Sequence, residues 1–154
     1  MLTAGDPSRY IYFIRKGMLR CYHMENGDEI CSMFIKEGDI FTSVSSFFLQ
    51  KKSNGFVQAI EDSHIWYLDY EELQYIFKHF AESNIIARVL LMKSYLHSER
   101  RLNLIRMKQA AERYNNMLMF FPNLVLRVPA KYLASYLGIS AGTLSRIRGK
   151  KYKD

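Results

Sequence analysis

The sequence predicts an α+β chain, with a β-roll in its first half and a set of helices in its second. Short apolar runs separated by glycine-bearing turns fill residues 10–68. Glycine and proline are then absent until Pro122, and apolar residues recur at helical intervals. The charge divides similarly, since residues 1–87 hold eight basic and twelve acidic residues and residues 88–154 hold fourteen and three.

Composition narrows the function classes. With 154 residues, 49% of them apolar and 24% charged, the chain is typical of globular proteins. Its apolar stretches are too short to cross a bilayer and Met1 opens no signal-peptide pattern, so we expect a cytoplasmic protein with no membrane partner. The basic second half indicates a polyanion partner, although a solvated basic surface would explain the charge equally well.

Five strands are predicted in the β-region, because each apolar run is bounded by turn residues. They are expected at Tyr10–Ile14, Met18–Met24, Ile30–Ile35, Phe56–Ile60 and His64–Leu68. The Asn26-Gly27 turn predicts a hairpin with Cys31 opposite Tyr22, so Cys21 and Cys31 fall on opposite faces and should form no disulfide. A redox or metal role for them is the weaker alternative.

No metal site, cofactor or enzymatic activity is predicted. The chain has no CxxC or HxH spacing, and its four histidines, at 23, 64, 79 and 97, are scattered without ligand spacing. A cupin-like enzyme is therefore the weaker alternative, which metal analysis would test.

Helices are expected after Asp69, which forms a capping-box pattern with Glu72 and begins a helix toward Phe80. A further helix is expected from Arg106 to Leu118, and Leu124–Pro129 is interpreted as a linker.

Between them, a helix is predicted from Ser83 to about Ser98. Its apolar residues are spaced by four, three and four, as in a seam between two helices. These seam residues are Ile85, Val89, Met92 and Leu96. The stripe predicts either a dimer interface or packing on its own domain.

The last helices carry the most specific signal. Pro129 stands where a helix begins, Leu133 and Leu137 form its apolar face, and Gly138 supplies a left-handed turn. A second helix, from about Ser140 through Lys150, is capped by Ser140 and turns polar side chains outward. This pattern predicts a helix-turn-helix, with a purely structural hairpin as the alternative.

Several short sequence segments of the chain resemble those of a known family. The runs RVPAKYLASYLGIS at 127–140 and TLSRIR at 143–148, with AERY at 111–114 and EGDI at 37–40, resemble the Bacteroidetes-type branch of the cyclic-AMP receptor protein/Fnr (Crp/Fnr) superfamily of bacterial transcription regulators. The resemblance covers essentially the whole chain and is strongest from Ala110 onward. It implies a cyclic-nucleotide-binding-like β-roll (a double-stranded β-helix) at 1–80, a dimerisation helix at 81–106 and a helix-turn-helix domain at 107–154.

The resemblance also implies a homodimer on a pseudo-palindromic site in double-stranded DNA, with RNA polymerase as a further candidate partner. Arg146 matches the base-reading arginine, which grips guanine O6 and N7, and the hydroxyls match phosphate contacts. The expected DNA-binding residues are Lys131, Ser140, Thr143, Ser145, Arg146, Arg148 and Lys150.

Some features depart from the family. In the nucleotide-binding site, nucleotide-binding members have a Gly-Glu pair and, further along the chain, an Arg-Ser or Arg-Thr pair. The arginine supplies the buried cation that a cyclic phosphate needs, and the glutamate supplies the carboxylate that the ribose needs. This chain has Thr42-Ser43 and Ser53-Asn54 there, and the lysines at 51 and 52 are better explained as surface charges. We therefore expect an effector pocket at these four residues, with an unknown effector other than cyclic AMP.

Other departures weaken the case for sequence-specific binding. Gly142 replaces a residue that often reads bases, and Ala141 offers no donor. The family's opening helix and strand are not evident, which would mean a truncated chain or a misplaced start. Its C-terminal wing hairpin is not evident either. The alternative function is an effector-binding or protein-interaction module that binds DNA only non-specifically.

Overall fold

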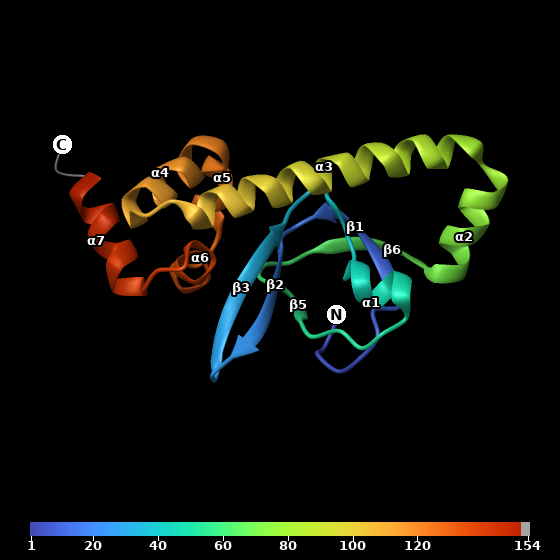
Figure 1. Cartoon of the computed structure of the whole chain (residues 1–154), viewed down its shortest axis with the longest axis horizontal. Helices are drawn as coiled ribbons and strands as arrows, with labels where there is room; N and C mark the ends of the chain where they lie inside the picture. The colour runs from blue at the N-terminus through green and yellow to red at the C-terminus, as the bar shows by residue number, and fades with distance from the viewer. Residues whose placement is uncertain (152–154) are drawn as a thin grey trace. The chain divides into compact units, whose positions relative to one another are not determined.

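The computed structural model describes residues 1–151 and divides into two compact units, residues 1–93 and 94–154, which are described separately. The boundary falls within helix α3 (Ala81–Arg106). Figure 1 shows strands and short helices in the first part of the chain and helices alone in the last part.

Two three-stranded antiparallel sheets form the first unit. Their orders are β4-β1-β6 and β3-β2-β5. The strands are β1 (Tyr10–Lys16), β2 (Leu19–Glu25), β3 (Asp28–Ile35), β4 (Ile40–Phe41), β5 (Phe56–Ala59) and β6 (His64–Asp69). The five predicted strands are therefore present, and the predicted α+β class is confirmed.

Alternating side chains from both sheets build the core of this unit. Ile14, Leu19 and Ile35 are at most 2% exposed, and Tyr12 and Val57 pack into the same cluster. Because strand side chains alternate between faces, one apolar set turns inward from each strand. Each fully buried aliphatic side chain stabilises the fold by about 1.5–3 kcal/mol relative to its exposed state.

The β2–β3 hairpin follows the sequence prediction. Asn26 and Gly27 both have positive φ, 51° and 89°, as a two-residue type I′ turn requires. Tyr22 lies opposite Cys31, as predicted, and a β-bulge separates that pair from Cys21 opposite Met33. Both cysteines are buried, and they form no disulfide with each other.

Two short elements were not expected from the sequence. Helix α1 (Val44–Leu49) and the two-residue strand β4 lie between β3 and β5. In α1, Phe47 is fully buried while its neighbours Phe48 and Leu49 are exposed. Six residues do not make two full helical turns, so no apolar periodicity was available to predict this helix.

Helix α2 (Tyr70–His79) begins as predicted. The Glu72 backbone N–H donates to Asp69 Oδ1 at 2.8 Å, and the Asp69 N–H donates to Glu72 Oε2 at 2.9 Å. This reciprocal capping box satisfies two N–H groups that the first helical turn leaves without partners.

The bounds predicted from the residue pattern for the next helices differ from those in the structure. Helix α3 begins at Ala81 rather than Ser83 and continues to Arg106. The Ser83 hydroxyl donates to the Phe80 carbonyl at 2.6 Å, so Ser83 lies within the first turn rather than at the N-cap. Helix α4 (Ala110–Phe120) starts later than predicted. The expected linker at Leu124–Pro129 is largely helix α5 (Pro122–Arg127), where Pro122 occupies a first-turn position that needs no N–H.

The second unit is a small helical domain. Helix α4 packs against α5, α6 (Ala130–Leu137) and α7 (Ala141–Lys151). Tyr114 and Met117 of α4, Leu133 and Leu137 of α6 and Leu144 of α7 are at most 5% exposed. Within residues 1–151, no helix is long and apolar enough to cross a membrane.

Candidate functional site

Helices α6 and α7 form the helix-turn-helix that the sequence predicted. Gly138 ends α6 in the left-handed conformation, with φ 64°. The Ile139 N–H donates to the Ala134 carbonyl at 3.1 Å, and the Gly138 N–H to the Ser135 carbonyl at 3.0 Å. These bonds satisfy carbonyls that the helix end would leave without partners, and they fix how the chain enters α7.

Three polar side chains gather on the first two turns of α7. The Thr143 N–H donates to Ser140 Oγ at 3.1 Å, and the two hydroxyl oxygens lie 2.9 Å apart. Arg146 Nη2 donates to Thr143 Oγ1 at 3.2 Å. Positions 140, 143 and 146 are three residues apart, so each side chain is a neighbour of the next on the helix surface. We call Ser140, Thr143 and Arg146 the α7 polar face.

This face is open to solvent. Ser140 and Arg146 are exposed and Thr143 is half-buried. Ser145 and, on α6, Lys131 are also exposed. A planar guanidinium held at a helix surface suits bidentate contact with phosphate or a guanine edge.

Two other predicted DNA-binding residues, Arg148 and Lys150, are not part of the α7 polar face. Arg148 is half-buried, and its Nη2 donates to the Val125 carbonyl at 3.5 Å, with the guanidinium 5.8 Å from the Tyr114 ring. Arg148 thus packs α7 onto α4 and α5. Lys150 lies in the last turn of α7, and its side chain is outside the described part.

The four predicted effector residues are brought together in the first unit. Thr42, Ser43, Ser53 and Asn54 line one hollow of about 390 Å³. Its other lining residues come mainly from β2, β3, β4, β5 and the start of α1. The structure brings the pairs Thr42-Ser43 and Ser53-Asn54 together although they are eleven positions apart in the chain, and their role in effector binding stays a prediction.

Internal hydrogen bonds already engage two of these hydroxyls. Thr42 Oγ1 donates to the Tyr10 carbonyl at 2.9 Å and lies 3.3 Å from Ser8 Oγ. Ser53 Oγ accepts from the Gly55 N–H at 3.1 Å. Among the described lining residues, no arginine or carboxylate occurs, and the basic side chains are Lys52 and His23. The hollow therefore offers hydroxyls and an amide rather than the charge pair of a nucleotide site.

The four seam residues of α3 are all exposed in the single chain. Their exposed fractions are 57% for Ile85, 45% for Val89, 60% for Met92 and 43% for Leu96. Large apolar side chains exposed at this spacing are unusual on a monomer surface.

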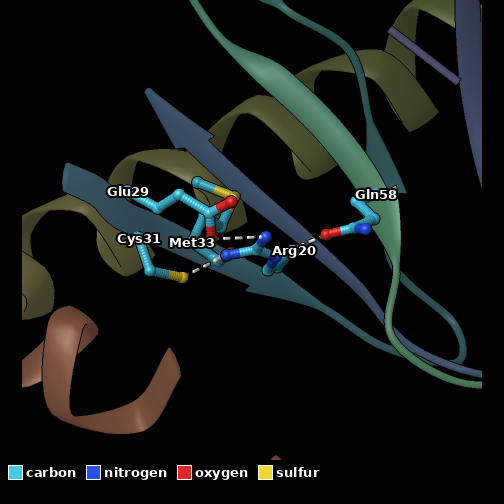
Figure 2. Close-up of polar contacts among 5 residues, drawn as sticks. All are labelled: Arg20, Glu29, Cys31, Met33 and Gln58. Carbon is cyan, nitrogen blue, oxygen red and sulfur yellow. Dashed lines mark hydrogen bonds and ion pairs between the residues drawn. The ribbon is translucent and has the colours of Figure 1, made fainter. Parts of the chain in front are cut away.

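A buried polar cluster on the β3-β2-β5 sheet was not predicted. Arg20 is 1% exposed, its Nη2 lies 2.8 Å from Glu29 Oε2, and its Nε donates to Gln58 Oε1 at 2.9 Å. Figure 2 shows the three side chains converging from adjacent strands. The one available signal was the arginine between Leu19 and Cys21 in an otherwise apolar strand start.

Among residues 1–151, no group of three or more His, Cys, Asp or Glu side chains is placed to hold a metal ion.

Known proteins are similar to this chain over nearly its whole length. The cyclic nucleotide-binding domain family model matches residues 1–80. The regulatory protein HlyX of Actinobacillus pleuropneumoniae is 28% identical over 171 aligned positions, covering 99% of this chain and 68% of that protein. The fumarate and nitrate reduction regulatory protein of Vibrio cholerae is 26% identical, covering 99% of this chain and 65% of that protein.

Solved structures share the fold. FixK2 from Bradyrhizobium japonicum superposes with a TM-score of 0.84 at 18% identity, covering 99% of this chain and 79% of that one. The c-di-GMP-responsive global regulator CLP of Xanthomonas campestris gives a TM-score of 0.73 at 20% identity, covering 100% and 82%.

A cyclic-nucleotide-binding β-roll followed in the chain by a helix-turn-helix is the architecture of a class of bacterial transcription regulators. The chain belongs to the cyclic nucleotide-binding domain family and is a member of the Crp/Fnr superfamily. The named relatives are regulatory proteins rather than enzymes. Assignment to the Bacteroidetes-type branch stays a prediction.

Proposed function

We propose that this chain is a sequence-specific DNA-binding transcription regulator that acts as a homodimer in the bacterial cytoplasm. The observation that carries the proposal is the α7 polar face, where the exposed Arg146 is held by Thr143 at 3.2 Å. A pre-positioned guanidinium can donate two parallel hydrogen bonds to guanine O6 and N7 in the major groove. Ser140 and Lys131 would contact phosphate and set the register.

The dimer is proposed to form through the seam residues of α3. Their exposure leaves an apolar stripe that a second copy of α3 would cover. Two recognition helices would then read half-sites about one DNA helical turn apart. A two-fold symmetric recognition motif is the signature expected of such a dimer.

The hollow in the β-roll is proposed to bind an effector other than a cyclic nucleotide. The described part of its lining has no arginine and no carboxylate to pair with a cyclic phosphate and a ribose, and its one lysine, Lys52, is exposed. Calorimetric titration with cyclic AMP is expected to give no saturable heat at micromolar nucleotide. Saturable binding that is lost on Ser53→Trp, which would fill the hollow, would contradict this.

Selection of genomic DNA fragments by the purified protein at about 0.15 M salt tests the main proposal, because specific binding persists at that salt while backbone contacts weaken. The Arg146→Ala variant is run in parallel. Recovery of a shared two-fold motif by the unaltered protein, and its loss in the variant, is the expected outcome.

A second candidate function is a protein-interaction or effector-binding module with only non-specific DNA binding. It is favoured by Ala141 and Gly142, which are exposed at the start of α7 and offer no side-chain donors. Recovery of random fragments by both proteins would favour this function over specific regulation.

A further inference from the structure

The helical unit contains a hollow that is separate from the α7 polar face. It has a volume of about 230 Å³ and lies between the last turns of α3, helix α4 and the α6 residue Tyr136. We call it the α3–α4 hollow. Its buried lining residues are Met117, Tyr136 and Leu104, which are 2%, 4% and 6% exposed.

The charge around this hollow has one sign. His97, Arg100 and Arg101 lie on its α3 side, and no acidic side chain is among its described lining residues. Arg101 is stacked on the Tyr136 ring at 3.9 Å, which fixes its guanidinium against the wall. Arg100 is exposed at the rim. An anion entering the hollow would therefore meet two guanidinium groups and no competing carboxylate.

The opposite wall is aromatic. Phe120 and Phe121 of the α4 end line it, and Phe121 also contacts the His97 ring at a centroid distance of 6.2 Å. Aromatic walls bind flat apolar bodies through stacked or edge contacts. Phe120 is 55% exposed, so it has free surface to offer a ligand.

Size restricts the ligand further. Sites for drug-sized molecules occupy roughly 300–1,000 Å³, and this hollow is smaller. A single ring with one or two substituents would fit. An anionic group on that ring would reach Arg100, while the ring would lie against Phe120 and Met117.

We propose that the α3–α4 hollow binds a small aromatic carboxylate, with Arg100 as the carboxylate partner and Phe120 as the ring contact. The site involves neither the β-roll effector hollow nor DNA, so a negative result for this proposal would not contradict the proposed function.

The α3 side of this hollow borders the proposed dimer seam. Consecutive residues on an α-helix are about 100° apart around its axis. Arg100 and Asn103 follow the seam residue Leu96 by four and seven residues, so they lie about 40° and 20° from it around the axis. A second α3 covering Leu96 would therefore lie beside Arg100, while Phe120 and Met117 line the hollow from α4.

Ligand-observed ¹⁹F NMR with 4-fluorobenzoate, using the full chain, tests the proposal. Saturable binding is expected, with the neutral isostere 4-fluorobenzamide at least about tenfold weaker, because a charge-assisted hydrogen bond is lost. Arg100→Gln should weaken benzoate binding by about 10- to 100-fold. Phe120→Ala should weaken the binding of both probes.

The matched control is Arg106→Gln. It removes the same charge from an exposed position at the end of the same helix, outside the hollow, and should bind 4-fluorobenzoate like the unaltered protein. Both arginines are exposed, so neither variant should disturb folding. Absence of saturable binding at millimolar probe, equal affinity for the amide, or equal loss in the Arg100 and Arg106 variants would each overturn the proposal.

Discussion

The Arg20 guanidinium lies 2.8 Å from the Glu29 carboxylate although Arg20 is 1% exposed. Arg20 and Glu29 stand on the neighbouring strands β2 and β3, and Gln58 of β5 accepts a further hydrogen bond from Arg20. The guanidinium also lies 4.0 Å from the centre of the Tyr22 ring. A buried cation is costly unless its donors are satisfied, so this cluster joins the three strands of one sheet in a single register.

Glu29→Gln is therefore expected to destabilise the β-roll. The substitution keeps the shape of the side chain but removes the charge that faces the buried guanidinium. We expect a loss of about 1–3 kcal/mol in the free energy of unfolding. Urea denaturation followed by the fluorescence of Trp66, the chain's one tryptophan, measures it.

The matched control for that experiment is Glu25→Gln, an exposed residue at the end of the same hairpin. It should change the stability by less than about 0.5 kcal/mol. Equal effects at positions 25 and 29 would mean that the ion pair contributes nothing specific.

Arg148 and Arg146 are expected to separate stability from DNA recognition. Arg148→Ala removes the contacts with Val125 and Tyr114 and should lower the thermal midpoint of the helical unit by several degrees, since about 1 kcal/mol shifts a small domain by 4–8 °C. Arg146→Ala should leave the midpoint unchanged but lose about 1–3 kcal/mol of discrimination at one base position. Circular dichroism melting and binding to single-base operator variants measure the two effects. If Arg146→Ala lowered the thermal midpoint and Arg148→Ala lost base discrimination, the roles assigned to the two residues would be wrong.

The seam of α3 predicts how the oligomeric state responds to charge. Leu96→Arg would place a cation in the apolar interface, and desolvating that cation should weaken dimerisation by about 100-fold or more. The control is Leu91→Arg, because Leu91 is 65% exposed on the same helix but away from the seam spacing. Sedimentation equilibrium should give monomers for the first variant at concentrations where the second is dimeric. Identical dissociation constants would exclude this seam.

Alkaline pH is expected to destabilise the β-roll through Cys21. Burial raises the pKa of the Cys21 thiol far above its usual 9.0, and the nearby Cys31 raises it further. The folded protein therefore keeps a proton that the unfolded chain releases, so stability is intact below about pH 9 and falls as pH rises further. Cys21→Ala should reduce the stability lost between about pH 8 and pH 10, measured from urea midpoints. An unchanged loss in the variant would assign the effect elsewhere, for example to Tyr12, whose pKa is also raised by burial.

Features encoded over a few neighbouring residues could be predicted from the sequence alone. The Asn26-Gly27 turn, the Asp69–Glu72 capping box and the left-handed Gly138 each depend on local backbone geometry. For the same reason the helix-turn-helix was found with its register correct. The linker interpretation of 124–129 failed because Pro122 suits the first turn of a new helix, which then includes Leu124 to Arg127.

Only the tertiary structure decided which distant residues meet. The Arg20–Glu29–Gln58 cluster depends on the pairing of three strands, and the α3–α4 hollow depends on how three helices pack. Arg148 illustrates the difference most directly, because its sequence position suggested DNA contact and the fold turns it onto the Val125 carbonyl. Turns, caps and helix faces follow from the preferences of a few neighbouring residues. Burial and long-range contacts arise when distant segments pack together, and that packing depends on the whole sequence rather than on any local pattern.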